Sequence, residues 1–100
     1  HNWYYRGFLS QKSSERQKAL RELRSEPYTT ILMETPYRLP ALLDDLETCW
    51  DSERRLALCW QLTTGQERVL RGTASEVAGL VEELQLGKGA FVIVLEGERA

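Results

Sequence analysis

The sequence has little histidine, little cysteine and no long hydrophobic run. Among its 100 residues it holds one histidine, His1, and two cysteines, Cys49 and Cys59. The cysteines are ten positions apart and form no CxxC pair, so their spacing argues against a zinc or other metal site. We interpret both as free thiols, which are typical of a cytoplasmic protein. With no internal histidine, the chain also lacks the most common general base of enzymes.

Membrane-spanning and secretory segments are missing as well. No apolar stretch approaches the roughly 20 residues that a membrane helix needs. The longest run, Ala90 to Leu95, has the length of a strand. The start of the chain shows no apolar signal-peptide core. The only methionine is Met33 and the chain begins with His1, so we expect an excerpt from a longer protein with no membrane partner.

The charge is small but unevenly distributed. The formal net charge is −2, whereas residues 1–24 carry six basic and two acidic side chains, which gives +4 and leaves −6 for the rest. This asymmetry is compatible with a surface for an anionic partner or with a solvated helix face. The domain as a whole is too acidic for a stand-alone nucleic-acid-binding protein.

The hydrophobic pattern predicts strands alternating with helices, in the order β-α-β-α-β-β-α-β. The expected strands cover residues 3–8, 28–33, 55–60, 68–71 and 90–95. This alternation predicts one α/β domain with a mixed five-stranded sheet and about three helices. The continuous apolar runs further predict a three-layer-like arrangement in which both faces of the sheet are covered.

Local signals mark the expected helix ends. Ser13 or Ser14 is a candidate cap for the first helix, and the proline at 36 or 40 suits the first turn of the second. Thr73 and Glu76 have the spacing of a capping box ahead of the third helix. A glycine at position 87 is expected to end that helix.

A search for catalytic motifs finds none, but two strand ends are distinctive. The chain has no GxSxG elbow, phosphate-binding glycine loop or HExxH motif. The acidic pairs at 44–45 and 82–83 are interpreted as solvated charges on helix surfaces. Residues 34–38 and 61–65 follow two strands, and ligands of α/β sheets gather at such ends. There Glu34 and Arg38 either orient each other at a ligand site or are ordinary helix-start and surface charges.

Several segments resemble, in order, the ribosomal RNA cytidine 2′-O-methyltransferases of the tetrapyrrole-methylase class. Gly7-Phe8-Leu9 with the following Lys12 and Arg16 resembles their GFLP-x-K…R segment. Residues 34–39, ETPYRL, resemble their E-[AST]-P-[HY]-R-[LI] motif, and residues 59–63 stand where they have A-R-E-L-T. Residues 67–73 and 91–97 are similar to their R-G-T and closing FVLVVEG segments. The five matches cover nearly the whole chain.

This resemblance implies that residues 1–100 form the C-terminal domain of a two-domain methyltransferase. In that class S-adenosyl-L-methionine binds between an N-terminal domain and the C-terminal domain, and homodimers are common. The resemblance places cofactor contacts at Glu34, Thr35, Leu62 and Thr63, largely through backbone atoms. It suggests that rRNA, the expected substrate, is bound with the help of Lys12, Arg16, Arg38 and Gln61. The residues that would carry the catalytic step stay unassigned.

The sequence also departs from the family pattern. Ser10 replaces the proline of FLP, and Trp60-Gln61 replaces the Arg-Glu pair of R-E-L-T. Trp and Gln cannot rebuild a bidentate Arg–Glu arrangement, so substrate handling is expected to differ. The alternative to an active enzyme is therefore a divergent or non-catalytic methylase-like domain that binds another ligand or partner. An unrelated α/β interaction domain is the third interpretation.

Overall fold

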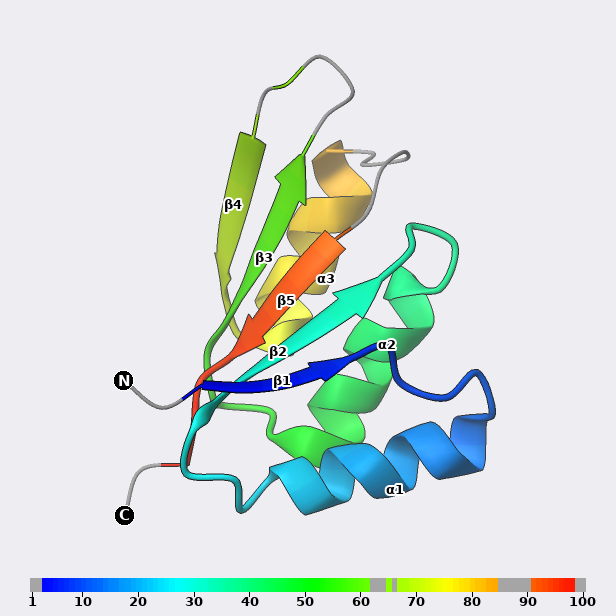
Figure 1. The fold of residues 1–100 in the computed structure, drawn as a ribbon. Coiled ribbons are helices and arrows are strands. Elements are labelled where there is room, and N and C mark those ends of the chain that lie inside the picture. The colour runs from blue at the N-terminus through cyan, green and yellow to red at the C-terminus, as the bar shows by residue number, and fades with distance from the viewer. Residues whose placement is uncertain (1–2, 62–64, 66, 85–90, 99–100) are drawn as a thin grey trace.

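The fold is a single mixed sheet with helices packed behind it, as Figure 1 shows. The computed structural model describes residues 3–61, 65, 67–84 and 91–98. The strands are β1 (Trp3–Gly7), β2 (Thr29–Glu34), β3 (Leu56–Gln61), β4 (Glu67–Gly72) and β5 (Phe91–Leu95). The helices are α1 (Ser13–Leu23), α2 (Leu39–Asp45), the π-helical turn η1 (Leu46–Trp50) and α3 (Ala74–Leu84).

The sheet has the order β1-β2-β5-β3-β4. Only β1 and β2 pair in parallel; β5 is antiparallel to both β2 and β3, and β4 is antiparallel to β3. The expected α/β class, with a mixed five-stranded sheet and three α-helices, is confirmed. Because β1, β2 and β3 all run in one direction, their carboxyl ends share one edge of the sheet.

The described helices all lie on one face of this sheet (Figure 1). The strands alternate accordingly: Phe91, Ile93 and Leu95 of β5 are buried beneath the helices, whereas Val92 and Val94 are half-buried on the other face. The second covering layer that we expected is therefore not formed by the described residues. Burial of one face alone gives strands their two-residue period.

The core lies between that face and the helices. It is dominated by leucines and also contains the aromatic side chains of Trp50, Trp60 and Phe91. The helical residues of this core follow the predicted spacing, since Leu39, Leu42, Leu43 and Leu46 are all almost fully buried. Spacings of three and four place them on one side of α2 and η1.

The helix ends confirm some predictions and correct others. Thr73 and Glu76 form the predicted capping box: Thr73 N–H donates to Glu76 Oε1 at 2.9 Å, and Glu76 N–H donates to Thr73 Oγ1 at 3.3 Å. The cap predicted for the first helix is wrong, because the N-cap residue of α1 is Lys12, with no side-chain cap. Instead, the Ser10 hydroxyl accepts the Lys12 N–H at 3.1 Å. The glycine at 87 lies outside the described residues.

Candidate active site

β2 and β3, the strands that precede the two predicted cofactor segments, end at the same edge of the sheet. Glu34, the last residue of β2, pairs with Phe91, which in turn pairs with Trp60 of β3. The segments that follow β2 and β3 therefore leave the same edge, two strands apart. Leu62 and Thr63, the other predicted cofactor contacts, lie outside the described residues.

Glu34 and Thr35 form a tight corner at the end of β2. The Glu34 side chain is 2% exposed, and its Oε1 accepts the Thr35 N–H at 2.8 Å. The Thr35 carbonyl accepts the N–H groups of Arg38 and Leu39, at 3.1 and 3.0 Å. These bonds fix the chain as it turns into α2. The carboxylate thus shapes the backbone here, and both main-chain groups of Thr35 are hydrogen-bonded within the turn. The predicted cofactor contacts of Glu34 and Thr35 stay predictions.

The segment after β1 is the third one at this edge. Gly7 has a φ of +74°, a left-handed value that glycine adopts without strain, and the chain turns out of the sheet there. The Ser10 hydroxyl donates to Glu15 at 2.8 Å, which ties the segment to the first turn of α1. Lys12 ends the segment with an exposed side chain. Its predicted substrate contact stays a prediction, and its exposure is compatible with it.

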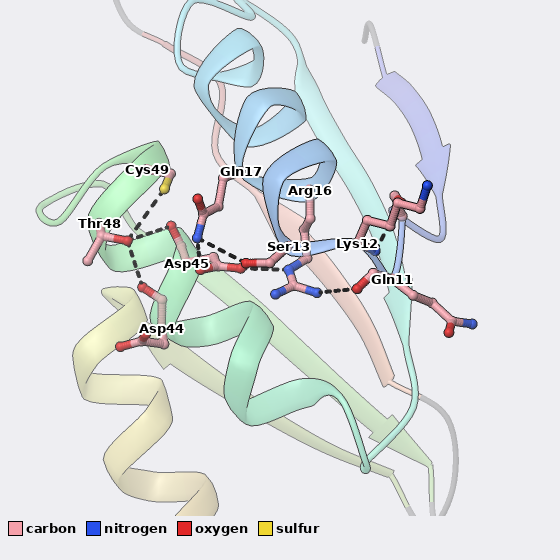
Figure 2. A network of polar contacts seen from close by, with 10 residues as sticks. Gln11, Lys12, Ser13, Arg16, Gln17, Asp44, Asp45, Thr48 and Cys49 are labelled. Atoms are coloured by element: carbon pink, nitrogen blue, oxygen red, sulfur yellow. Dashed lines mark hydrogen bonds and ion pairs between the residues drawn. The ribbon is translucent and has the colours of Figure 1, made fainter.

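Arg16 is buried, whereas a cation that contacts the substrate directly is expected to be exposed. Its side chain is 11% exposed, and its Nε lies 2.6 Å from Oδ2 of Asp45, whose side chain is 8% exposed. Gln17 Nε2 donates to the other Asp45 oxygen at 3.2 Å, and Figure 2 shows this junction between α1 and the end of α2. Our interpretation of Asp45 as a solvated charge is wrong, since Arg16 neutralises it inside the fold; Asp44 is exposed as expected.

Arg38 contacts the segment after β1 instead of Glu34. With the Gln11 amide turned so that its oxygen faces Arg38, that oxygen accepts from Nη2 at 2.8 Å and from Nη1 at 3.3 Å. The Gln11 main-chain carbonyl accepts from Arg16 Nη1 at 3.4 Å. The idea that Glu34 and Arg38 orient each other is therefore wrong, because Glu34 turns back to Thr35 and Arg38 turns to Gln11.

Trp60 belongs to the core. Its side chain is buried on the helix-covered face, with its ring stacked on Phe91 at a centroid distance of 6.1 Å and an interplanar angle of 14°. Trp60, which stands where the resemblance places an arginine, therefore packs in the hydrophobic core near the carboxyl end of β3. Gln61 ends β3 and pairs with Glu67. Its predicted role in substrate binding stays a prediction.

Sequence reasoning missed Gln11 and Asp45, although one signal was available. Arg16 stands four residues before Leu20 and seven before Leu23, on the apolar stripe of α1. A cation on such a stripe is buried and requires an acidic partner. Asp45 stands four residues before the buried Cys49, at the margin of the next apolar stripe. No local pattern identifies Gln11, whose contacts are made across the fold.

Two cavities of the described part lie away from the predicted site residues. One of about 260 Å³ lies where β3 begins and is lined by Arg55, Ala57 and Arg71, among others. The other, of about 460 Å³, lies between α2 and α3. Within the described ranges no group of three or more His, Cys, Asp or Glu side chains could hold a metal ion. No helix in the same ranges is long and apolar enough to cross a membrane.

A comparison with known protein families identifies the family of this chain. The family model of the Tetrapyrrole (Corrin/Porphyrin) Methylases matches residues 5–78. The chain belongs to the tetrapyrrole methylase family. That match includes the segments after β1 and β2 and the network between α1 and α2.

Individual relatives agree with the family assignment. The chain is 38% identical over 97 residues to ribosomal RNA small subunit methyltransferase I of Micromonospora olivasterospora, covering 97% of this chain and 31% of that protein. It is 40% identical over 93 residues to the protein of the same name from Synechocystis sp., covering 93% and 33%. The chain thus spans about a third of the length of these curated relatives.

Solved structures agree on the fold. The cobalt precorrin-4 methyltransferase CbiF superposes with a TM-score of 0.65 at 10% identity, covering 96% of this chain and 40% of that structure. The methyltransferase CobJ gives a TM-score of 0.63 at 12% identity, with 100% and 44% coverage. At such low identities the likeness establishes a shared fold.

Proposed function

We propose that this chain is the C-terminal domain of an S-adenosyl-L-methionine-dependent methyltransferase that acts on small-subunit rRNA at a cytidine 2′-oxygen. The observation that carries the proposal is the common edge of the sheet. β2 and β3, which precede the two segments predicted to contact the cofactor, end at this edge with only β5 between them, as the Glu34–Phe91–Trp60 register indicates. The identity to relatives named rRNA methyltransferases supports the substrate.

The chemistry of this proposal matches what the domain contains. Methyl transfer from a sulfonium depends mainly on bringing donor and acceptor together in line, so it needs few acid–base groups. At the described edge, the Glu34 carboxylate and the hydrogen bonds of Thr35 fix the turn after β2, and Lys12 and Arg38 supply cations. Cofactor contacts through Glu34, Thr35, Leu62 and Thr63 would supply one wall of the cleft. An N-terminal domain would supply the other wall.

Calorimetry with S-adenosylhomocysteine tests the cofactor assignment on the full-length protein. We expect binding by the wild type and at least tenfold weaker binding by Thr35→Arg, whose longer side chain would obstruct the corner after β2. Ser52→Arg is the matched control, because Ser52 is exposed beyond the opposite end of the sheet. A folded full-length protein that shows no binding would refute the methyltransferase assignment.

The isolated 100-residue chain provides a second test of the two-domain arrangement. We expect it to bind S-adenosylhomocysteine weakly or not at all, because half of the proposed cleft is absent. Tight binding by this chain alone would contradict the arrangement. Transfer of a labelled methyl group to small-subunit rRNA then tests the substrate. Cofactor binding without that transfer would support the cofactor assignment and contradict the assignment of rRNA as substrate.

The proposal extends to assembly and location. We propose a cytoplasmic homodimer, and two observations support it. Cys49 and Cys59 are free thiols, as expected in a reducing compartment. The helix-free face of the sheet exposes Trp3 and Tyr5, at 68% and 64%, and exposed aromatic surface of this kind is typical of an interface. Sedimentation equilibrium of the full-length protein would measure the oligomeric state directly.

A further inference from the structure

The buried pair of Arg16 and Asp45 is an unusual choice at its position. Arg16 occupies the apolar stripe of α1, where a leucine or methionine would pack against the same neighbours. Removing two charges from water costs several kcal/mol per ion, and apolar replacements of such pairs are often neutral or stabilising. Fold stability alone therefore does not account for this pair.

The pair is the buried end of a chain of contacts that reaches two loops. Asp45 holds Arg16 Nε at 2.6 Å, and Arg16 Nη1 donates to the Gln11 carbonyl at 3.4 Å. With the Gln11 amide turned as described above, its oxygen accepts from Arg38 Nη2 at 2.8 Å, and the Arg38 backbone N–H donates to the Thr35 carbonyl at 3.1 Å. The segment after β1 and the turn after β2 are thereby joined through one glutamine. Figure 2 shows the inner part of this chain, with Arg16 between Gln11 and Asp45.

We infer that Arg16 and Asp45 are positioning residues for the anionic substrate. By anchoring Gln11, they hold the segment after β1 against the turn after β2, so that the cations of Lys12 and Arg38 are presented together at the carboxyl edge. Lysine and arginine contacts to phosphates fix the position of a nucleic acid on a protein. The inference rests on the proposed function, and it gives Arg16 a role behind the substrate surface.

The test replaces the charged pair by apolar residues in the full-length protein. The double variant Arg16→Met/Asp45→Leu removes the hold on Gln11 and leaves no unpaired buried charge, so we expect its thermal stability to be retained. We expect the KM for small-subunit rRNA to rise about tenfold, while kcat and the affinity for S-adenosylhomocysteine stay within about twofold, the pattern of lost ground-state binding. A purely structural pair would leave KM unchanged once stability is retained.

Gln11→Ala is the second variant, and it works even if the double variant folds poorly. Gln11 is exposed, so its truncation breaks the link to Arg38 with little effect on folding. We expect a smaller rise in KM, in the same direction. Asp51→Asn is the matched control, since Asp51 also pairs with an arginine, Arg54 at 3.3 Å, but at the other end of the sheet.

The outcomes separate the inference from the proposed function. An unchanged KM in both variants would overturn the inference, as would parallel losses of kcat, cofactor affinity and stability. A wild-type protein that neither binds S-adenosylhomocysteine nor methylates rRNA would overturn the proposed function itself, before any variant is compared.

Discussion

The two ends of the sheet each contain an Arg–Asp pair, and the pairs differ in depth. At the carboxyl end of β1, β2 and β3, Arg16 and Asp45 are both buried, 29 residues apart in sequence. At the opposite end, Arg54 pairs with Asp51 three residues away, and the Asp51 side chain is 34% exposed. The Arg16–Asp45 contact joins two helical elements, whereas the Arg54–Asp51 contact lies within one turn. Arg54 reaches a distant segment through its other nitrogen, since Nη2 donates to the Arg24 carbonyl at 2.8 Å.

The surroundings of the pairs differ in the same way. At the opposite end, the Asp51 carboxylate is bound locally, since it accepts the N–H groups of Glu53 and Arg54 at 2.9 and 3.1 Å. The backbone N–H of Glu53 is the main cause that lowers the pKa of Asp51 below its ordinary 3.8. At the carboxyl end, side chains connect loops that the backbone does not join. The carboxylate at the opposite end therefore fixes a local turn, while the buried carboxylate at the carboxyl end binds an arginine that is distant in sequence.

The largest loss of stability is expected when only one residue of the buried Arg16–Asp45 pair is removed. Asp45→Ala leaves the Arg16 guanidinium buried without its anion, and such single removals cost about 3–5 kcal/mol. Urea denaturation would show the loss in the free energy of unfolding. Asp51→Ala is the control, with an expected loss of about 1 kcal/mol or less because the pair is partly solvated. Equal losses at both sites would remove the distinction between the two ends.

Substitution of Gly97, at the opposite end of the sheet, is expected to give the next largest loss of stability. A Cβ added at Gly97 would lie 2.3 Å from the Pro27 carbonyl oxygen, so the backbone would have to move. We expect Gly97→Ala to destabilise the protein by about 1–3 kcal/mol, the usual cost of overpacking. Gly79→Ala is the matched control, since it has open space within α3 and replaces a poor helix former. A loss for Gly79→Ala as large as that for Gly97→Ala would contradict the steric argument.

The capping box is expected to contribute less. Thr73→Ala removes the hydroxyl that accepts the Glu76 N–H at the start of α3, a loss of about 1 kcal/mol. Ser75→Ala, two residues further on and exposed, should change the unfolding free energy by less than half of that. Thermal unfolding of the two variants side by side would measure the difference. Similar melting temperatures would show that the cap is not needed to start the helix.

The sequence was informative where structure is local. The capping box at Thr73 and Glu76, the apolar stripes and the sequence of strands and helices along the chain depend on spacings of two to four residues, and the structure confirms them. The Arg16–Asp45 pair and the Gln11–Arg38 contact join residues 27 to 29 positions apart, and a local pattern cannot identify such partners. The resemblance to a family supplied the predicted cofactor and substrate contacts, which stay predictions. Only the fold shows that Arg16 lies behind that surface.

The smallest expected effect concerns the charge of Glu76. The backbone N–H of Thr73, with its side chain as a second cause, holds the pKa of Glu76 below its ordinary 4.5. A carboxylate with a lowered pKa in the folded state stabilises the protein above its ordinary pKa, and this contribution is lost as the pH falls through the folded-state value. The melting temperature of the wild type should therefore exceed that of Glu76→Gln at pH 7, and this difference should narrow below about pH 4.5. Glu82→Gln, exposed on the same helix, controls for the removal of one negative charge. A gap for Glu76→Gln that stays constant to pH 3 would assign its effect to packing rather than to the charged cap.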